Sequence, residues 1–208
     1  MGIRRDSAPR LLLAAAVLLL LAALAAGGTT AWTWLGRTRD IHAAQQRLSR
    51  GLEAQWASGA APPARPAPIA RLHLPTLRLD LVVVGGSAEA DLRQGPGLIP
   101  GTAPIGAAGN TGIAGGRYPG VFWELDRVGI GDPVVLETRE AWLVYRVIEA
   151  RVVRPDDDAL LEPPPPGAGP RLTLVTGDPR LSAARRLVRQ ATLVRRDPHA
   201  GPRPAELA

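Results

Sequence analysis

Residues 69–84 read Ile-Ala-Arg-Leu-His-Leu-Pro-Thr-Leu-Arg-Leu-Asp-Leu-Val-Val-Val, and apolar side chains take every second position on either side of the proline. The alternating apolar positions are Ala70, Leu72 and Leu74, then Leu77, Leu79, Leu81 and Val83, with Arg71, His73, Arg78 and Asp80 between them. A period of two is typical of strands that bury one face. Because Pro75 has no amide hydrogen to donate, it separates the two runs. The stretch therefore predicts two consecutive half-buried strands.

Further segments downstream have the composition of short strands. They are Thr111–Ala114, Pro133–Glu137, Ala141–Val153, Arg171–Thr176 and Leu187–Arg195. Residues 137–141 predict a hairpin turn between two of them. Beyond residue 67 no segment keeps a helical period for more than about two turns. Seven or eight short strands in residues 67–197 predict a mainly β fold, closed into a barrel or packed as a sandwich.

The amino-acid composition excludes several classes of active site. The chain has 208 residues, enough for a membrane anchor and one domain of ordinary size. All 25 basic residues are arginine, so there is no P-loop, Schiff-base or protein-kinase lysine. The absence of cysteine excludes disulfides, cysteine-ligated zinc and a cysteine nucleophile.

The net charge of +6 is concentrated at the N-terminal end. Residues 1–66 contain eight arginines and three acidic residues, whereas residues 67–197 contain sixteen arginines and fifteen acidic residues. A nucleic-acid-binding protein is expected to carry its positive charge on the folded domain. The nearly neutral domain argues against a nucleic-acid partner.

Residues 11–36 contain no charged side chain and are rich in leucine and alanine. At about 1.5 Å per residue, roughly 20 helical residues cross the hydrocarbon core of a bilayer, and this stretch of 26 is long enough. Three arginines precede it, so the positive-inside rule places residues 1–10 in the cytoplasm. We expect a single-pass signal-anchor helix in the cytoplasmic membrane, with the β domain on the extracytoplasmic side. The alternative is a cleaved signal peptide, because Ala23-Leu24-Ala25 resembles a small-residue cleavage site.

Between the anchor and the β domain the sequence predicts a short helix and a linker. Apolar side chains recur at helical spacing over residues 37–58, which indicates an amphipathic helix. The proline-rich residues 59–68 indicate a stiff linker. The expected organisation is a cytoplasmic N-terminus (1–10), a transmembrane helix (11–36), a juxtamembrane helix and linker (37–66), a β domain (67–197) and a tail (198–208).

Two long loops, Gly85–Gly109 and Arg154–Gly169, interrupt the predicted strands. Loops of this length in compact domains are usually functional or disordered. The second loop contains Asp156, Asp157 and Asp158, and grouped carboxylates can bind calcium. Because the three lack the spacing of a ligand set, we favour a solvated acidic loop and expect neither a metal nor a cofactor.

Four stretches of the β domain together resemble a known family. They are residues 92–117 (LRQGPGLIPGTAPIGAAGNTGIAGGR), 122–138 (FWELDRVGIGDPVVLET), 173–179 (TLVTGDP) and 184–191 (ARRLVRQA). In order and spacing they resemble the sortases, most closely the class D, class E and Gram-negative types, over roughly Ile69–Arg196. The resemblance implies an eight-stranded β-barrel on an N-terminal anchor. It also implies a cysteine transpeptidase that cleaves the sorting signal of a surface protein and passes the acyl group to an amine.

At the catalytic positions that the resemblance implies, this chain departs from active sortases. Gly116 stands where the family has the histidine that acts as general acid and base, and Gly177 stands where it has the nucleophilic cysteine. Arg186 matches the third catalytic group, an arginine nine residues after the cysteine. Leu98 replaces a histidine that often follows Gly-Pro-Gly in relatives. Because glycine supplies neither nucleophile nor base, covalent acyl transfer has no side chain through which to proceed.

Other residues near these motifs bear on a replacement nucleophile or on a peptide groove. Thr176 and Ser182 have hydroxyls, but no histidine or lysine is placed in the sequence to activate them. The histidines are expected near the membrane (His42), on the outward face of a strand (His73) and in the tail (His199). As groove candidates we take Thr176, Arg117 and Leu98. Arg186 is either a vestige of the catalytic trio or an arginine at the barrel rim.

The leading hypothesis is a membrane-anchored, monomeric pseudo-sortase that has lost its transpeptidase chemistry. Its expected partners are a sorting-signal peptide or an active sortase. One alternative is an active transpeptidase, with catalytic groups supplied from elsewhere or with the two glycines introduced artificially. Another is an envelope scaffold that binds no sorting peptide. A peptide-binding role predicts an apolar cleft leading to Gly177, whereas a scaffold predicts a filled one.

Overall fold

The structure, a computed structural model, describes residues 39–59, 67–180 and 182–208. The chain forms two compact units, Met1–Arg39 and Asp40–Ala208, and nearly all described residues belong to the second. The predicted anchor over residues 11–36 lies outside the described residues. Among those that are described, no helix is both long enough and apolar enough to cross a membrane.

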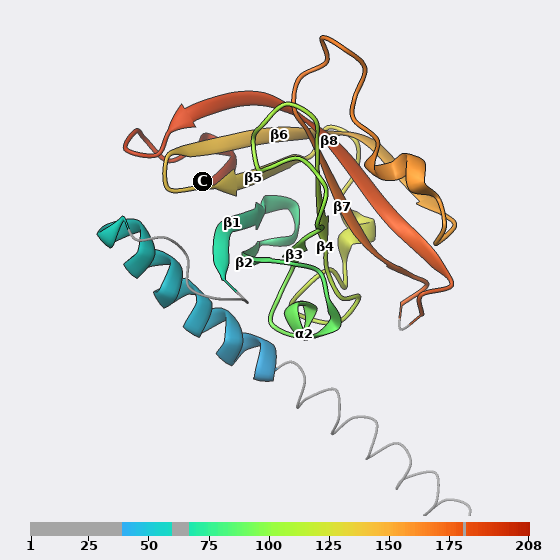
Figure 1. Ribbon diagram of the computed structural model, residues 1–208, viewed down its shortest axis with the longest axis horizontal. Coiled ribbons are helices and arrows are strands. Elements are labelled where there is room, and N and C mark those ends of the chain that lie inside the picture. Colours follow the sequence, from blue (N-terminus) through green and yellow to red (C-terminus); the bar gives the residue numbers. More distant parts are fainter. Residues whose placement is uncertain (1–38, 60–66, 181) are drawn as a thin grey trace, which may run out of the picture. The chain divides into compact units, whose positions relative to one another are not determined.

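In the described part of the chain, a helix over residues 39–58 precedes eight strands (Figure 1). The strands are β1 (Pro68–Leu74), β2 (Leu79–Gly85), β3 (Gly97–Leu98), β4 (Asn110–Ala114), β5 (Pro133–Glu137), β6 (Ala141–Val153), β7 (Arg171–Asp178) and β8 (Arg185–Pro198). The short helical segments are η1 (Pro75–Leu77), α2 (Glu89–Leu92), η2 (Leu125–Arg127), η3 (Asp158–Leu161) and η4 (Ala205–Leu207).

The strands close into a barrel in the order β1-β2-β3-β4-β7-β8-β6-β5, with β5 paired to β1. Two neighbouring pairs are parallel, β2 with β3 and β4 with β7, and the others are antiparallel. The closed eight-stranded barrel that the resemblance implied is confirmed. Closure leaves no long edge exposed, so the short strands need no second sheet to cover them.

The predicted strands agree with the structure, except at their ends and in one loop. β5 and β6 have the predicted bounds, and residues 137–141 form the predicted hairpin turn between them. β7 and β8 extend beyond the predicted segments. The predicted loop Gly85–Gly109 contains α2 and the two-residue strand β3. A strand of two residues is too short to show a period of two, which is why the sequence did not reveal it.

Alternation along the strands fills the interior of the barrel. Leu72, Leu81, Ile113, Leu136 and Leu174 are all at most 3% exposed and belong to one continuous core. Their polar sequence neighbours lie on the outer face, as a period of two requires. The inward-facing residues of the strands therefore supply the main core, and several outward-facing residues are buried as well by the elements that cover the barrel.

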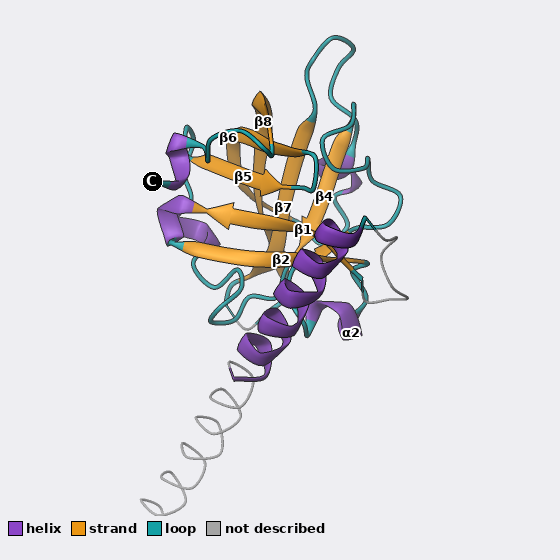
Figure 2. Cartoon of the chain, turned by 90° about the vertical axis from the view of Figure 1, so that its left-hand side faces the viewer, coloured by secondary structure: helices purple, strands orange, loops and turns teal. Residues whose placement is uncertain are grey.

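The helix over residues 39–58 covers the outer face of β2 (Figure 2). Leu48 and Leu52 on the helix pack against Val82 and Val84, which point away from the barrel interior. The predicted amphipathic helix is present, and its apolar stripe lies against the barrel. At the other end of the chain, the Glu206 carboxylate is 2.8 Å from the Arg195 guanidinium, so the last residues also lie against the barrel.

Candidate functional site

The parallel pairing of β4 with β7 brings the two glycine positions together. The last pair of the ladder joins Ala114 to Val175, and the Gly115 amide donates to the Val175 carbonyl at 3.0 Å. Gly116 and Gly177 therefore lie beside each other, at the same end of neighbouring strands. They are 61 positions apart in the sequence, so only the fold makes them neighbours.

Arg186 completes the group, because β8 pairs with β7 in a register that places Arg186 opposite Gly177. Its guanidinium donates to the Ala183 carbonyl at 3.3 Å, within the turn that joins the two strands. The structure thus brings together the three positions where the sortase resemblance implied a histidine, a cysteine and an arginine. Of the three side chains, only the arginine is present.

The space for a side chain at position 177 is occupied by the backbone. A Cβ atom with ideal geometry on Gly177 would lie 2.3 Å from the carbonyl oxygen of Ser182. Non-bonded carbon and oxygen atoms do not approach so closely, and backbone yields less readily than the end of a side chain. A cysteine at this position therefore requires the β7–β8 turn to move.

The space for a side chain at position 116 is occupied by an aromatic ring. A Cβ on Gly116 would lie 1.8 Å from a ring carbon of Tyr118. The Tyr118 hydroxyl donates to the Leu92 carbonyl at the end of α2, which helps to hold the ring. No sequence motif pointed to Tyr118, because its role depends on a contact with α2.

Arg117 is buried beside Gly177 instead of lining an open groove. Its guanidinium lies 3.0 Å from the Asp126 carboxylate and donates to the Gly177 carbonyl at 3.4 Å. Arg180 also pairs with Asp126 at 3.1 Å and stacks on the Trp123 ring. Burial raises the pKa of the Asp126 carboxyl, but its backbone hydrogen bonding and the two guanidiniums outweigh that effect and hold the pKa below its usual value.

The other two groove candidates differ in exposure. Thr176 lies two positions after Leu174 on β7, so the two side chains share the inner face of the barrel wall. Thr176 is 3% exposed. The Thr176 hydroxyl has no hydrogen-bond partner. Leu98 is half-buried on β3, opposite Ile113 of β4. Thr176 is therefore not a lining residue of an outer groove.

A buried polar cluster anchors the β6–β7 loop to the outer face of the sheet. The Leu160 carbonyl accepts hydrogen bonds from Asn110 at 3.1 Å, from Thr173 at 3.4 Å and from Gln190 at 2.9 Å. The Thr173 hydroxyl also donates to the Asn110 side-chain oxygen at 2.8 Å. Asn110 and Thr173 belong to the motifs that carry the resemblance, and here both fix a loop.

That loop also fills part of the face between β4 and β7. A Cβ on Gly112 would lie 2.9 Å from a methyl carbon of Leu161 and 3.0 Å from one of Ile99. Farther toward the beginning of β4, a cavity of about 500 Å³ remains between residues 101–110 and residues 161–168. Its lining carries no charged side chain and includes the four prolines 163–166. This cavity does not include Gly177 in its lining.

Two of the three histidines, His73 and His199, belong to a cluster on β1 and β5, away from the glycine positions. His73 lies on β1 and hydrogen-bonds to Glu137 on β5, and in the barrel order β1 is four strands from β7. His199 contacts the same glutamate at 2.9 Å. His42, on the N-terminal helix, approaches Gly120 in the loop after Gly116, with its ring carbon 3.7 Å from the Cβ position.

The described residues hold no group of three or more histidine, cysteine, aspartate or glutamate side chains that could bind a metal ion. In the acidic loop, the Asp156 carboxylate pairs with Arg154 at 3.3 Å, and both side chains are largely exposed. The geometry agrees with a solvated acidic loop.

The contact between Gly116 and Tyr118 makes a prediction about stability. Gly116→Ala is expected to destabilise the fold by about 1–3 kcal/mol, because the added methyl overlaps the ring. In a Tyr118→Ala background the same change is expected to cost much less. Gly129→Ala is the matched control, since a Cβ there meets no atom within 4 Å. Denaturant unfolding of the four variants measures the coupling. Equal costs of Gly116→Ala in both backgrounds would contradict the overlap.

Comparison with known proteins agrees with this geometry. Residues 72–194 match the family model "Sortase domain". Sortase SrtE1 of Streptomyces coelicolor is 28% identical over 191 residues, which cover 80% of this chain and 52% of the relative. The chain therefore spans about half the length of that curated relative.

Solved structures of class E sortases share the fold. Sortase E of Streptomyces avermitilis superposes with a TM-score of 0.61 at 28% identity, covering 68% of this chain and 97% of the other. Sortase E1 of Streptomyces coelicolor, solved with a tripeptide in the active site, gives a TM-score of 0.63 at 26% identity, covering 68% and 96%. With its closed barrel, its adjacent catalytic positions and a family match over more than half of its length, the chain belongs to the sortase family.

Proposed function

We propose that this chain is a pseudo-sortase, a sortase domain that acts by binding and has no transpeptidase chemistry. The proposal rests on one observation: both catalytic positions are glycines, and other groups occupy the space for their side chains. Gly116 and Gly177 lack the side chains that the reaction needs, and Tyr118 and the Ser182 carbonyl occupy the space for them. The centre has therefore lost both the reactive atoms and the room to hold them.

The chemistry of acyl transfer explains why this loss is decisive. A covalent intermediate needs a nucleophilic atom that an adjacent base or a lowered pKa activates. In other enzymes, removal of the catalytic trio leaves a reaction rate at most about 10³–10⁴-fold above the uncatalysed rate in water. This residual acceleration comes from oxyanion stabilisation and substrate binding. Arg186 alone can contribute at most to that residual rate acceleration.

Neither candidate hydroxyl supplies a replacement nucleophile. Thr176 is buried in the barrel wall without a hydrogen-bond partner, and the Ser182 hydroxyl accepts a hydrogen bond from the Ala184 amide at 3.1 Å. Among the described residues, neither hydroxyl is hydrogen-bonded to an imidazole. A serine or threonine at its ordinary pKa is a weak nucleophile without such a base.

A binding role draws support from the solved relative and from the open part of the groove. The Streptomyces coelicolor sortase E1 holds a tripeptide in its active site. In this chain we place a sorting-signal peptide against the uncharged cavity between residues 101–110 and 161–168. The filled space at Gly112, Gly116 and Gly177 favours the second candidate, a scaffold that binds no sorting peptide.

We further propose that residues 11–36 anchor the chain in the cytoplasmic membrane, with the barrel on the extracytoplasmic side. The support is the uncharged stretch of 26 residues that follows three arginines. Protease added to intact spheroplasts is then expected to degrade the barrel, whereas a cytoplasmic marker protein stays intact. A barrel that is digested only after the cells are lysed would refute this topology.

The unmodified chain is expected to show no cleavage or transpeptidation of sorting-signal peptides. Thiol-dependent cleavage is expected only in variants that combine Gly116→His with Gly177→Cys. It is expected to increase when Tyr118→Ala is added, because that change removes the ring from the histidine position. Mass spectrometry of the peptide products measures both effects.

The matched control replaces Gly177→Cys by Gly177→Ala, which keeps the added Cβ atom and removes the sulfur. Cleavage by this control would mean that the activity does not pass through the new thiol. Turnover by the unmodified chain would overturn the proposal and would direct attention to Thr176 and Ser182.

Peptide binding separates the pseudo-sortase from the scaffold. A sorting-signal peptide is expected to bind the unmodified chain, and Ala108→Trp is expected to weaken its Kd by about tenfold or more because the indole enters the cavity. Ala150→Trp, exposed on β6, is the control. Calorimetric titration that shows no binding would favour the scaffold. Equal effects of the two tryptophans would place the peptide elsewhere.

A further inference from the structure

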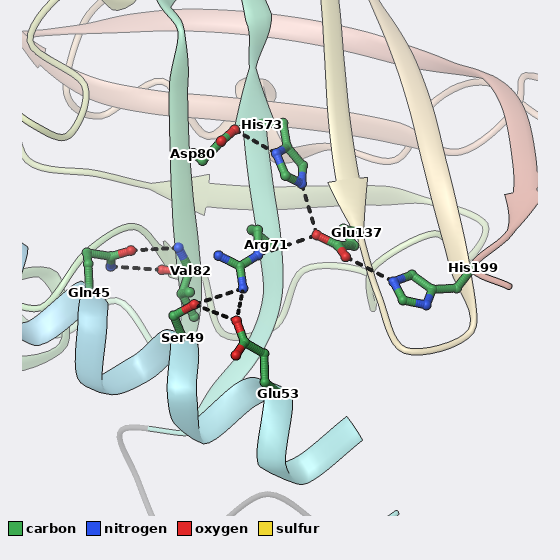
Figure 3. Close-up of polar contacts among 9 residues, drawn as sticks. All are labelled: Gln45, Ser49, Glu53, Arg71, His73, Asp80, Val82, Glu137 and His199. Carbon is green, nitrogen blue, oxygen red and sulfur yellow. Dashed lines mark hydrogen bonds and ion pairs between the residues drawn. The ribbon is translucent and has the colours of Figure 1, made fainter. Parts of the chain in front are cut away.

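A cluster of charged side chains lies on the barrel wall opposite the β4–β7 site (Figure 3). We call Arg71, His73, Asp80, Glu137 and His199 the His73 cluster. His73 was expected on the outward face of its strand, and it does lie there, but it is only 3% exposed. The sequence did not reveal this burial, because elements distant in the sequence cover the ring.

The two ring nitrogens of His73 contact two different carboxylates. Nδ1 lies 2.6 Å from an Asp80 oxygen, and Nε2 lies 3.0 Å from a Glu137 oxygen. An ionised carboxylate only accepts hydrogen bonds, and a neutral imidazole has a single N–H. Both bonds therefore form together only when His73 is an imidazolium. With both carboxylates ionised, the geometry therefore fits a buried imidazolium between two anions.

Glu137 receives three cationic or imidazole partners. Besides His73, the His199 ring nitrogen lies 2.9 Å from its second oxygen, and the Arg71 guanidinium is 3.4 Å away. Burial raises the pKa of the Glu137 carboxyl, but hydrogen bonds from His73 and His199 and the Arg71 charge outweigh burial, so the pKa lies below its usual value. Glu137 is therefore the anionic centre of the cluster.

The cluster joins both ends of the described chain to the barrel. Arg71 donates to Ser49 at 2.9 Å and to Glu53 at 3.1 Å, and both residues belong to the helix over residues 39–58. The His199 ring stacks on Trp142 of β6, with centroids 5.2 Å apart. It also meets the edge of Trp56 on the helix at 5.4 Å. Arg71 and His199 thus connect the helix to the barrel and to the C-terminal segment.

The charges that face the cluster balance only when both histidines are protonated. The anions are Glu53 from the helix, Asp80 from β2 and Glu137 from β5; the permanent cation is Arg71 from β1. Protonated His73 and His199 make three cations against three anions, whereas neutral rings leave a single cation. The β5–β6 turn adds Arg139 and Glu140, which have opposite charges, and the His199 amide donates to the Glu140 carbonyl at 3.0 Å. From β6, Trp142 stacks on His199.

We propose that His73, Glu137 and His199 form a protonation-dependent latch that holds the helix over residues 39–58 and the C-terminal segment from His199 onward against the barrel. The latch is closed when both imidazoles are protonated and Glu137 is ionised. Deprotonation removes one N–H from each ring and leaves uncompensated carboxylates in a half-buried site, so the two segments loosen.

The direction of the pH dependence follows from the two kinds of group. The bonds from the protonated rings to the carboxylates stabilise the closed state, and their contribution is lost when the rings lose their protons at higher pH. Because the pKa of Glu137 is lowered in the folded state, its ionised carboxylate stabilises the closed state at any pH above the pKa of the unfolded state. This contribution is lost when the pH falls through the pKa of the folded state. The latch therefore holds at mildly acidic pH and opens toward alkaline pH.

Hydrogen–deuterium exchange on the full chain in detergent tests the latch. Exchange is followed from pH 5 to 9 in peptides from residues 41–58 and 199–208, with β7 as internal reference, after correction for the intrinsic pH dependence. Hydrogen bonds to charged groups are strong, so their loss should favour opening. The equilibrium constant for opening of each segment is therefore expected to increase by about tenfold or more from pH 5 to pH 9. The corrected exchange of β7 is expected to stay constant.

Three variants distinguish the latch from ordinary packing. His73→Gln removes the titrating charge, so both segments are expected to exchange rapidly at every pH without a step. His199→Arg keeps a positive charge that can stack on Trp142, and the C-terminal segment is expected to stay protected at alkaline pH. His42→Gln is the control outside the cluster and is expected to preserve the wild-type step.

Two outcomes would overturn the latch. One is wild-type exchange in both segments with no pH dependence beyond the intrinsic one. The other is a step that persists in His73→Gln or that disappears in His42→Gln. If His73→Gln does not fold, His199→Arg and His199→Gln carry the test, because His199 is one-third exposed and its replacement leaves the barrel core intact. The latch then fails if both show the wild-type step.

Discussion

The parallel pairing of β4 with β7 is the constraint on which the rest of this structure depends. It closes the barrel between two parts of the chain that are about 60 residues apart, and it sets the register that places Gly116 beside Gly177. The bond between Thr173 and Asn110 joins the two strands on their outer face and, with Gln190, fixes the β6–β7 loop. Buried polar groups of this kind are costly unless satisfied, so the pairing and the loop support each other.

The two glycine positions differ from the family pattern in side chain, and the space around them is occupied by neighbouring groups. Protein interiors are close-packed, and neighbouring groups occupy space that a side chain leaves. Here the Tyr118 ring lies over Gly116, and the Ser182 carbonyl lies over Gly177. A third contact, of Leu161 with Gly112, reduces the space on the same face. The glycines are thus part of a packed surface, whereas the cavity between residues 101–110 and 161–168 lies toward the beginning of β4.

The charged residues of this lysine-free domain form two buried arrangements on opposite sides of the barrel. Near the glycine positions, the guanidiniums of Arg117 and Arg180 share the Asp126 carboxylate. On the β1–β5 side, Glu137 is hydrogen-bonded to two imidazoles and forms an ion pair with one guanidinium. The first arrangement contains permanent cations, so its charge does not change near neutral pH. The second contains histidines, and it is there that we propose a coupling between packing and protonation.

The sequence by itself determined the strands and the presence of glycine at the two positions where the family has its histidine and cysteine. A strand with one buried face repeats every two residues, so local pattern sufficed for β5 and β6, and the family motifs placed glycine at both reactive positions. Only the tertiary structure decided what surrounds those positions. The occupation of the Gly116 and Gly177 side-chain space, the inward placement of Thr176 and the burial of His73 all arise from contacts with elements distant in the sequence. No local pattern records such contacts, because packing depends on which surfaces the closed barrel brings together.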